Sequence, residues 1–485
     1  MNRSTNDASR VRRELMIRVI REFLNDTLAA DIDRIPCELR PRDGKFSRCC
    51  VYKDRAVLKY RLMALLGIGI ETETDEAKTL SAYLADALQR TGKPTEILSV
   101  LDVACSHCVT SRYLVTNACR GCFARPCTFA CPRGAISVVG NQAQIDYDKC
   151  IDCGKCTQVC PYHAIIRVPV PCEEACPVGA ISRDETGRQF INFSTCISCG
   201  KCMTACPFAA ILERSQLIDI LQLLKAKRKL VAMVAPSIIG QFSGKLGQIA
   251  AALIQAGFSS MVEVAYGAEM TTEHEAKEFF ERMKKGDHIM TSSCCPAYVE
   301  AVKRHVPQLL PFVSSTPSPM RFAAQSVKAA DPDAVTVFIG PCVAKRKEAL
   351  SDVNTDYVMT FEELGALLAA QDIDVASQEP LPLERDVKGY ARGFATSCGV
   401  TAAILTEAAD ARGIPESDRP EINAKFIDGL DRKAVKQLEL YAQGKLPGNF
   451  LEVMACEGGC VGGPCAIGKV TLATEAVKKA ASGQH

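Results

Sequence analysis

The spacing of apolar and polar residues divides the chain into three parts. Residues 10–30 and 54–90 show the repeat of amphipathic helices, and a Pro- and Arg-rich stretch, 36–50, separates them. Residues 101–212 contain no long periodic segment, which predicts mostly loops and short strands. From about residue 213 onward, strand-like apolar runs alternate with helix-like runs, and this alternation predicts an α/β arrangement.

The α/β part has a regular predicted order. Helices are expected at 214–228, 243–256 and 272–284, and strands at 229–237, 261–267, 288–293, 334–342 and 357–360. The later strands end at Pro, Cys or Ser in a loop. Because ligands of open α/β sheets bind beyond the carboxyl ends of strands, we expect a site at these loops.

The most unusual feature of the composition is the number of cysteines. Hydrophobic residues make up 47% of the 485-residue chain, which suits two to four globular domains, and the net charge of +2 favours neither nucleic acid nor an anionic membrane as a partner. No stretch reaches the roughly 18 apolar residues of a membrane span. The N-terminus lacks the apolar segment of a secretory signal, so we expect a reducing cytoplasm. There, 26 cysteines indicate metal binding rather than disulfides.

Two cysteine runs have the spacing of bacterial ferredoxins: Cys150-x2-Cys153-x2-Cys156-x3-Cys160-Pro and Cys196-x2-Cys199-x2-Cys202-x3-Cys206-Pro. In such a run, three thiolates hold one [4Fe–4S] cluster and the fourth binds a partner cluster. The duplicated spacing favours iron–sulfur clusters over zinc or disulfides. By contrast, Cys37, Cys49 and Cys50 have no neighbouring His and are expected to be ordinary thiols.

The other cysteines between residues 101 and 212 complete the two runs as partner half-motifs. The resulting sets of four are Cys119, Cys122, Cys127 and Cys160; Cys131, Cys150, Cys153 and Cys156; Cys176, Cys196, Cys199 and Cys202; and Cys105, Cys108, Cys172 and Cys206. In this interpretation a first ferredoxin unit, 119–168, is inserted inside a second. Three clusters with four idle cysteines are the alternative. Either arrangement forms a path for single electrons.

Three later segments also carry cysteines: TSSCCPAY (291–298), GPCVAKRKE (340–348) and LEVMACEGGCVGGP (451–464). In order and spacing they resemble the three signature motifs of the [FeFe]-hydrogenases, and the resemblance covers about 229–465. It implies an α+β multidomain protein. The expected parts are a helical N-terminal region over 1–100, a ferredoxin-like [4Fe–4S] region over 101–212, and a two-lobed α/β iron hydrogenase catalytic domain over 213–485.

The resemblance also implies a cofactor, the H-cluster, which joins a [4Fe–4S] cluster to a diiron subcluster with CO, cyanide and a dithiolate. Its expected ligands are Cys295, Cys342, Cys456 and Cys460, of which Cys460 bridges to the diiron part. Beside the diiron part, the matched positions are Pro236 and Ser237, Lys345 and Met454; Ser237 and Lys345 correspond to donors to cyanide. Glu348 matches the motif carboxylate and is expected to pair with a buried base.

A proton path is implied by the same resemblance. Its expected members are Glu278, Glu275, Ser314 and Cys294, in that order. The two glutamates lie three residues apart in a helix-like segment and therefore share a face; alone, they would be typical of a solvated helix face. Cys294 suits proton transfer because a thiol with a pKa near ~8.5 exchanges protons close to neutral pH.

The sequence departs from the best-known hydrogenases at several positions around these motifs. Gly340 stands where they have Met, Tyr298 replaces Trp, Met320 replaces Gln, Cys398 occupies a TGGV-like turn, and the final glycine run is shortened to 462–464. These changes resemble the group B branch of the family, and every expected cluster ligand is retained.

The activity implied is the reversible interconversion of protons, electrons and H₂. The implied partners are a ferredoxin or similar one-electron carrier and the hydrogenase maturation proteins. Alternatives are a non-catalytic iron–sulfur assembly factor, a hydrogen sensor and an electron-transfer subunit. Cys294, Lys345 and Met454 argue against the assembly factor, because a [4Fe–4S] cluster alone needs neither a proton relay nor a cyanide donor.

Overall fold

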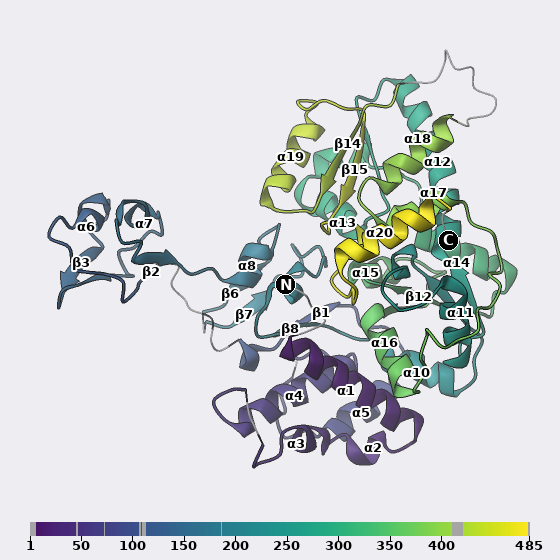
Figure 1. Cartoon of the computed structure of the whole chain (residues 1–485), viewed down its shortest axis with the longest axis horizontal. Helices are drawn as coiled ribbons and strands as arrows, with labels where there is room; N and C mark the ends of the chain where they lie inside the picture. The colour runs from purple at the N-terminus through teal and green to yellow at the C-terminus, as the bar shows by residue number, and fades with distance from the viewer. Residues whose placement is uncertain are drawn as a thin grey trace.

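The computed structural model describes residues 6–44, 47–71, 73–105, 108, 113–185, 187–409 and 421–483. Figure 1 shows N-terminal helices at the bottom, a cysteine-rich region that extends to the left, and a large α/β region on the right. Within the described residues, every helix is too short or too polar to cross a membrane.

The described part of the N-terminal region contains the helices α1 (Asp7–Leu24), α2 (Leu28–Asp31), α3 (Ile35–Leu39), α4 (Val51–Leu65) and α5 (Leu80–Gln89). The sequence predicts a single helical run over 54–90. This prediction is wrong in its continuity, because α4 ends at Leu65 and α5 begins only at Leu80. The chain leaves α4 through Gly67, whose φ of 76° is a conformation that favours glycine. Buried residues of α1, such as Leu15 and Val19, join the same apolar core as strands of the α/β region.

The cysteine-rich region consists of two-stranded antiparallel sheets and helices of five residues. The strand pairs are β1 (Leu98–Val100) with β8 (Ile211–Glu213), β2 (Tyr113–Val115) with β5 (Ile165–Arg167), β3 (Ile136–Val139) with β4 (Gln142–Ile145), and β6 (Ile181–Arg183) with β7 (Gln189–Ile191). The β2–β5 pair is nested in sequence inside the β1–β8 pair. Sheets of two strands are marginal by themselves, so this region depends on other links to stay folded.

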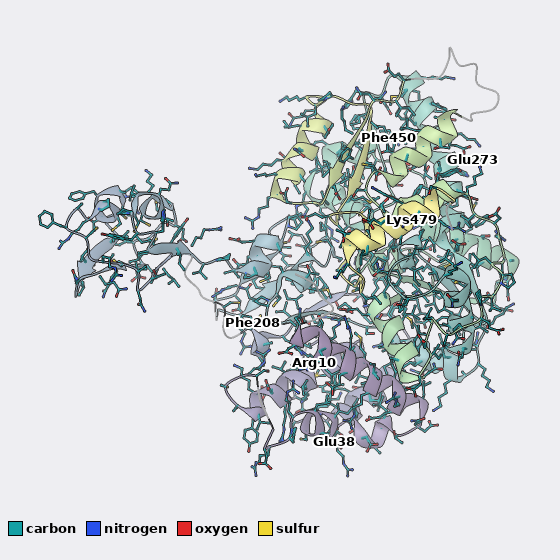
Figure 2. All side chains as sticks on the ribbon, in the orientation of Figure 1. Arg10, Glu38, Phe208, Glu273, Phe450 and Lys479 are labelled. Carbon is teal, nitrogen blue, oxygen red and sulfur yellow. The ribbon has the colours of Figure 1, made fainter. Side chains whose placement is uncertain are left out.

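Four short helices complete this region: α6 (Pro126–Ala130), α7 (Lys155–Val159), α8 (Pro171–Ala175) and α9 (Lys201–Ala205). Each is followed by a Cys-Pro pair. The segment 113–167 forms a lobe that stands apart from the rest of the chain (Figure 1), and its side chains project outward on every side drawn in Figure 2.

Two parallel sheets build the α/β region. The first has the order β10 (Ser260–Glu263), β9 (Leu230–Val234), β12 (Val335–Gly340) and β13 (Tyr357–Thr360). The second has the order β11 (Met290–Thr291), β15 (Phe450–Met454) and β14 (Ala424–Asp428). Every residue of β9 and β12 is buried, as expected for parallel strands covered on both faces.

Helices surround both sheets. They are α10 (Leu217–Lys225), α11 (Leu246–Gln255), α12 (Val264–Lys285), α13 (Pro296–His305), α14 (Pro319–Ala330), α15 (Ala344–Leu350), α16 (Phe361–Ala370), α17 (Gly389–Arg392), α18 (Gly399–Ala409), α19 (Arg432–Ala442) and α20 (Val470–Ala481). The strand expected over 261–267 stops at Glu263, where α12 begins. A Cβ at Gly267 would lie 2.1 Å from the carbonyl oxygen of Pro319, so this part of α12 packs very closely against α14.

A buried ion pair joins the cysteine-rich region to the first sheet. Arg346 is fully buried, and its Nη2 donates to both carboxylate oxygens of Glu363 at 2.8 and 2.7 Å. Its Nη1 donates to the carbonyl of Arg214, just after β8, at 2.9 Å. Since α15 carries Arg346 and also follows the GPC loop, this pair holds the loop in place.

We expect Arg346→Ala to lower the free energy of unfolding by about 3–5 kcal/mol, because Glu363 is left buried and uncompensated. Chemical denaturation under anaerobic conditions measures this change. The matched control is Lys277→Ala, which removes an exposed ion pair to Glu273 and should cost less than about 1 kcal/mol. Equal losses in the two variants would contradict the assigned role of Arg346.

Candidate functional site

Four cysteines from three segments meet at the carboxyl ends of parallel strands. Cys295 lies at the start of α13, after β11, and Cys342 follows β12. Cys456 and Cys460 follow β15. All four line one cavity. The loops that the sequence places far apart are thus brought together at a single cavity.

Most of the cavity wall is apolar. Its other lining residues are Cys199, Ala235, Pro236, Ser237, Val264, Ala268, Cys294, Pro296, Ala297, Pro319, Met320, Phe338, Pro341, Ala344, Lys345, Phe394, Ala395, Met454, Ala455, Gly459 and Gly463. The wall therefore includes Pro236, Ser237, Lys345, Met454 and Cys294, all of them expected from the sequence to lie beside the cofactor.

Burial strongly affects the ionisation of Cys342, Cys456 and Cys460. Burial, reinforced by Cys295 and Cys460, raises the pKa of Cys342 to about 12, and burial and Cys295 raise the pKa of Cys460 to about 11. The pKa of Cys456 is raised well above its usual value by burial and the same neighbours. Such thiols ionise only when a cation compensates them. Four converging sulfurs in an apolar cavity with space beyond them fit a cysteine-bound iron–sulfur cluster with an attached group.

Ser237 and Lys345 add polar groups to this wall. The Oγ atom of Ser237 is buried and has no hydrogen-bond partner among the described residues, a costly state that an acceptor in the cavity would relieve. Lys345 donates from Nζ to Glu348 at 2.6 Å, to Ser318 Oγ at 3.2 Å and to the Cys294 carbonyl at 3.4 Å. Burial acts to lower the pKa of Lys345, but Glu348 outweighs it and the pKa is raised.

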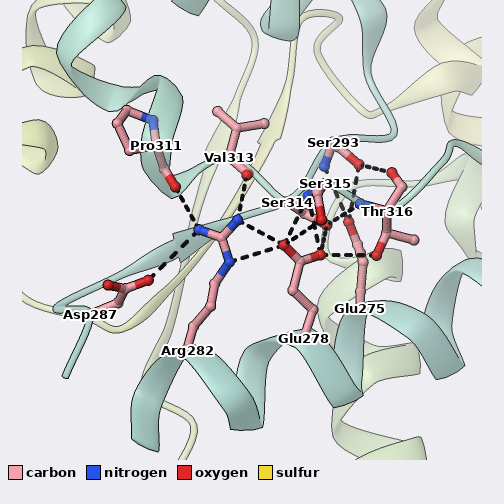
Figure 3. A network of polar contacts seen from close by, with 10 residues as sticks. All are labelled: Glu275, Glu278, Arg282, Asp287, Ser293, Pro311, Val313, Ser314, Ser315 and Thr316. Carbon is pink, nitrogen blue, oxygen red and sulfur yellow. Dashed lines mark hydrogen bonds and ion pairs between the residues drawn. The ribbon is translucent and has the colours of Figure 1, made fainter. Parts of the chain in front are cut away.

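A polar network leads from the surface of α12 towards the cavity (Figure 3). Glu278 accepts hydrogen bonds from Arg282 at 2.7 Å, from Ser314 Oγ at 2.7 Å and from Thr316 Oγ1 at 3.0 Å. Burial acts to raise the pKa of Glu278, but these donors and the backbone N–H of Ser315 outweigh it, so the pKa is lowered. Glu278 is therefore an anion held by several donors.

Glu275, one turn earlier on α12, has the opposite character. It is fully buried, its Oε1 accepts from the N–H of Ser293 at 3.2 Å, and its Oε2 has no partner among the described residues. Burial raises the pKa of Glu275 to about 7, although bonds from Ser293 and Ser314 oppose this. Ser314 donates to Glu278 and is also close enough to Glu275 to lower its pKa. Burial and then Glu275 raise the pKa of Cys294 well above its usual value.

Sequence reasoning missed three side chains of this network, Arg282, Ser293 and Ser318. Arg282 stands four residues after Glu278 on one helix, a spacing that predicts an ion pair and could have been recognised. Ser293 and Ser318 lie in loops. Their contacts with Glu275, Lys345 and Glu348 arise only from the tertiary fold.

The cysteines of the 101–212 region also lie in groups. Burial raises the pKa of Cys105 to about 12 with contributions from Cys206, Cys108 and Cys172. Burial, Cys196 and Cys176 likewise raise the pKa of Cys199 to about 12. Cys127 is close enough to Cys160 and Cys122 for their charges to raise its pKa beyond the effect of burial. Finally, one pocket is lined by Cys131, Cys150, Cys153 and Cys156.

Each of the four Cys-Pro pairs that follow α6, α7, α8 and α9 carries a further regular contact. The residue four positions later is alanine in every case, and its backbone N–H donates to the cysteine sulfur: Ala135 to Cys131 at 3.2 Å, Ala164 to Cys160 at 3.4 Å, Ala180 to Cys176 at 3.2 Å and Ala210 to Cys206 at 3.4 Å. Donors of this kind stabilise a thiolate and tune a bound cluster. The repeat Cys-Pro-x-x-Ala was available in the sequence and was missed.

The structure shows the surroundings of three residues that differ from the better-known hydrogenases: Gly340, Tyr298 and Cys398. A Cβ at Gly340 would lie 2.6 Å from the Phe338 ring, which lines the cavity, so a larger side chain at position 340 would require this ring to move. Tyr298 is fully buried and donates to Thr291 Oγ1 at 2.7 Å. Cys398 does not line the cavity and has a φ of 67°, a left-handed conformation that favours glycine.

In the N-terminal region, the sulfurs of Cys49 and Cys50 are 3.9 Å apart, and Cys37 and Cys49 are exposed. Among the described residues, none of these three cysteines belongs to a group of metal-ligating side chains.

Comparison with known proteins supports the iron–sulfur character of both regions. The family described as iron only hydrogenase large subunit, C-terminal domain, matches residues 228–464. A 4Fe-4S binding domain matches residues 143–166, and a 4Fe-4S dicluster domain matches residues 171–210.

Several characterised proteins are similar over long segments. The periplasmic [Fe] hydrogenase large subunit of Nitratidesulfovibrio vulgaris is 30% identical over 371 residues, covering 66% of this chain and 85% of the relative. Iron hydrogenase 1 of Clostridium pasteurianum is 28% identical over 302 residues, about half of each chain (52%). The cytosolic iron-sulfur assembly component 3 of Rattus norvegicus is 24% identical over 256 residues, covering 43% of this chain and 54% of the relative.

Among solved structures, an apo [FeFe]-hydrogenase HydA1 variant from Chlamydomonas reinhardtii aligns with a TM-score of 0.45 and 22% identity, over 53% of this chain and 87% of its own. The 30% identity to a hydrogenase large subunit extends across 85% of that relative. Together with the matched catalytic and 4Fe-4S domains, it establishes that this chain, with its cysteine-lined cavity, belongs to the iron-only hydrogenase family.

Proposed function

We propose that the chain is an [FeFe]-hydrogenase that interconverts protons, electrons and H₂. The observation that carries this proposal is the cavity: it combines four convergent cysteines with a buried lysine, an unpartnered serine hydroxyl and a further thiol. A scaffold for a [4Fe–4S] cluster alone requires only the four thiolates. The additional polar groups favour a hydrogenase over an assembly factor, whose known members are also related to this chain.

The residues present fit the H-cluster, which supplies the metal site where protons and electrons combine. Cys295, Cys342, Cys456 and Cys460 would hold the [4Fe–4S] part, with Cys460 shared with the diiron part. Lys345 and Ser237 would donate hydrogen bonds to its anionic ligands, and Glu348 keeps Lys345 charged. Pro236 and Met454 line the same apolar wall and help to exclude water.

The protein's own side chains offer a proton route between the surface and the cavity. Arg282 holds Glu278 near the surface, Ser314 donates to Glu278 and lies close to Glu275, and Cys294 lines the cavity. These contacts favour the order Glu278, Ser314, Glu275, Cys294 over the order expected from the sequence. Glu275 suits the middle of the route because its pKa of about 7 allows it to accept and release protons near neutral pH.

For the electrons, we propose four accessory [4Fe–4S] clusters, held by the four convergent cysteine sets. The nested β1–β8 and β2–β5 pairs support one ferredoxin unit inserted in the other. Cys199 lines the main cavity, and its charge contributes to the raised pKa of Cys456. The cluster of the Cys199 set would therefore be the last step before the catalytic site.

Electrons would enter at the outlying lobe, 113–167. Two of its aromatic residues, Phe123 and Phe129, are 102% and 87% exposed. The same lobe also exposes basic side chains, of which Lys149 pairs with Asp146: Arg120, Arg125, Arg133, Lys149 and Lys155. Exposed aromatics within a basic surface suit an acidic ferredoxin. Maturation proteins would insert the diiron part.

The proposal is tested by hydrogen turnover with reduced viologen, together with infrared spectroscopy of the matured protein. We expect H₂ formation and bands of iron-bound CO and CN⁻. In Cys294→Ser the bands should persist while turnover falls by about 100-fold or more, the range lost with a proton-transfer group. Cys398→Ser is the matched control, because its thiol lies off the cavity wall. Fully matured protein without the CO and CN⁻ bands would instead support an assembly factor.

The raised pKa of Glu275 predicts a pH-dependent stability. Between its ordinary value of 4.5 and about 7, the folded protein binds a proton that the unfolded chain releases, so stability is highest below this window and falls as pH rises through it. At about 1.4 kcal/mol per pKa unit, the loss is about 3 kcal/mol. Denaturation from pH 5 to 8 should show that Glu275→Gln lacks this decline. Glu281→Gln, exposed on the same helix, should keep it.

The docking assignment predicts a selective defect in the double variant Phe123→Ser, Phe129→Ser. Because the lost surface contacts only the partner protein, KM for an acidic two-cluster ferredoxin should rise about tenfold or more, while turnover with the small electron donor viologen stays at the wild-type level. Phe190→Ser, an exposed aromatic outside the lobe (41% exposed), serves as the control. An unchanged KM for ferredoxin in the double variant would place electron entry elsewhere.

A further inference from the structure

The N-terminal helical region contacts the cysteine-rich region through two arginines. Arg48 donates from Nη1 to the carbonyl of Ala104 at 3.3 Å and from Nη2 to the carbonyl of Phe208 at 3.4 Å. Arg61, on α4, donates from Nη2 to the carbonyls of Phe208 and Ala209, both at 3.5 Å. Figure 2 shows Phe208 where the N-terminal helices meet the cysteine-rich region.

These contacts place both arginines next to one cysteine set. Ala104 immediately precedes Cys105, and Phe208 lies two residues after Cys206. Cys105 and Cys206 belong to the set that is completed by Cys108 and Cys172. Both guanidinium groups therefore donate hydrogen bonds to backbone carbonyls that lie next to Cys105 or shortly after Cys206 in the chain.

The positive charge at this contact is not balanced by the protein. Arg61 is only 8% exposed, its Nε has no partner, and no carboxylate among the described residues forms an ion pair with it. The nearby Asp54 is already shared by Arg40 at 3.6 Å and Arg48 at 3.7 Å. Burial, and then the charges of Arg48, Arg12 and Arg40, lower the pKa of Arg61 to about 10. A buried cation without an anion is strongly unfavourable.

The adjacent cysteine set supplies such an anion once it holds metal. A [4Fe–4S] cluster with four thiolate ligands carries net negative charge, and that charge increases by one electron on reduction. The attraction to a fixed cation is therefore stronger in the reduced state. Arg183 also lies close to Cys108, but it is 3.9 Å from Glu173, so its charge is partly balanced by a carboxylate whereas that of Arg61 is not.

We propose that Arg61, supported by Arg48, is the counter-cation of the cluster held by Cys105, Cys108, Cys172 and Cys206, and that the N-terminal helices thereby raise its reduction potential. This proposal rests on the cluster assignment in the proposed function. It gives the helical region an electrostatic role: the cluster at this junction takes up one electron from a neighbouring accessory cluster more readily than it would if it faced solvent.

The test uses the full chain, reconstituted anaerobically with iron and sulfide and titrated while its reduced clusters are followed by electron paramagnetic resonance. In Arg61→Met, the ratio of reduced to oxidised cluster at a fixed potential should fall about tenfold for one accessory cluster, or 59 mV for a one-electron couple, with the others unchanged. Arg61→Lys keeps the charge and should stay within about threefold of the wild type. Cys105→Ala identifies the signal by removing it.

Arg90→Met is the matched control, because Arg90 is another largely buried arginine of the same region but pairs with Asp219 at 2.6 Å. It should leave every cluster potential unchanged. If Arg61→Met loses the cluster, retention of iron by Arg61→Lys still supports the proposal, whereas equal loss in both variants indicates a packing role and overturns it. A wild-type titration of Arg61→Met also overturns it. If Cys105→Ala leaves the spectrum unchanged, Cys105 does not bind a cluster and the proposal is overturned. The proposed hydrogenase activity is tested separately, by the turnover assay.

Discussion

The structure depends on the gathering of cysteine thiols that burial keeps from ionising. In the main cavity, Cys342, Cys456 and Cys460 have raised pKa values because they are buried and lie close to one another. Without metal, burial and the neighbouring sulfurs favour the protonated thiols, because apolar surroundings disfavour the charge of a thiolate. A bound iron–sulfur cluster reverses the balance by replacing protons with metal. The cysteine-rich region follows the same rule, with short sheets and helices that are too small to be stable alone.

Elsewhere in the structure, most buried charged side chains are paired with groups of opposite charge or with hydrogen-bond donors. Arg346 and Glu363 neutralise one another beneath the GPC loop, and Lys345 is kept charged by Glu348 at the cavity wall. Glu278 is held as an anion by Arg282 and several hydroxyls, whereas Glu275, with fewer donors, has a pKa near neutrality. Arg61 differs from all of these because no carboxylate among the described residues forms an ion pair with it. For the two glutamates, burial and the number of hydrogen-bond donors together decide which carboxyl group titrates near neutral pH.

Several features could be predicted from local sequence and others could not. Strands such as Leu230–Val234 and Val335–Gly340 agree with expectation, because continuous apolar runs suit strands that are buried on both faces. The expected strand at 261–267 largely became helix, since Gly267 allows α12 to approach α14, a contact invisible to local pattern. The place of Ser314, close to both glutamates, likewise arises from a loop that packs against the helix.

The sequence by itself determined which residues could bind metal, because cluster ligation requires thiolates at fixed short spacings within each ferredoxin run. It also determined the α/β alternation, through the period of its apolar residues. Only the tertiary structure decided that Cys295, Cys342, Cys456 and Cys460 share one cavity, and that Arg48 and Arg61 lie beside the Cys105 set. The physical reason is distance along the chain: local pattern specifies each segment, whereas long-range packing specifies which segments meet.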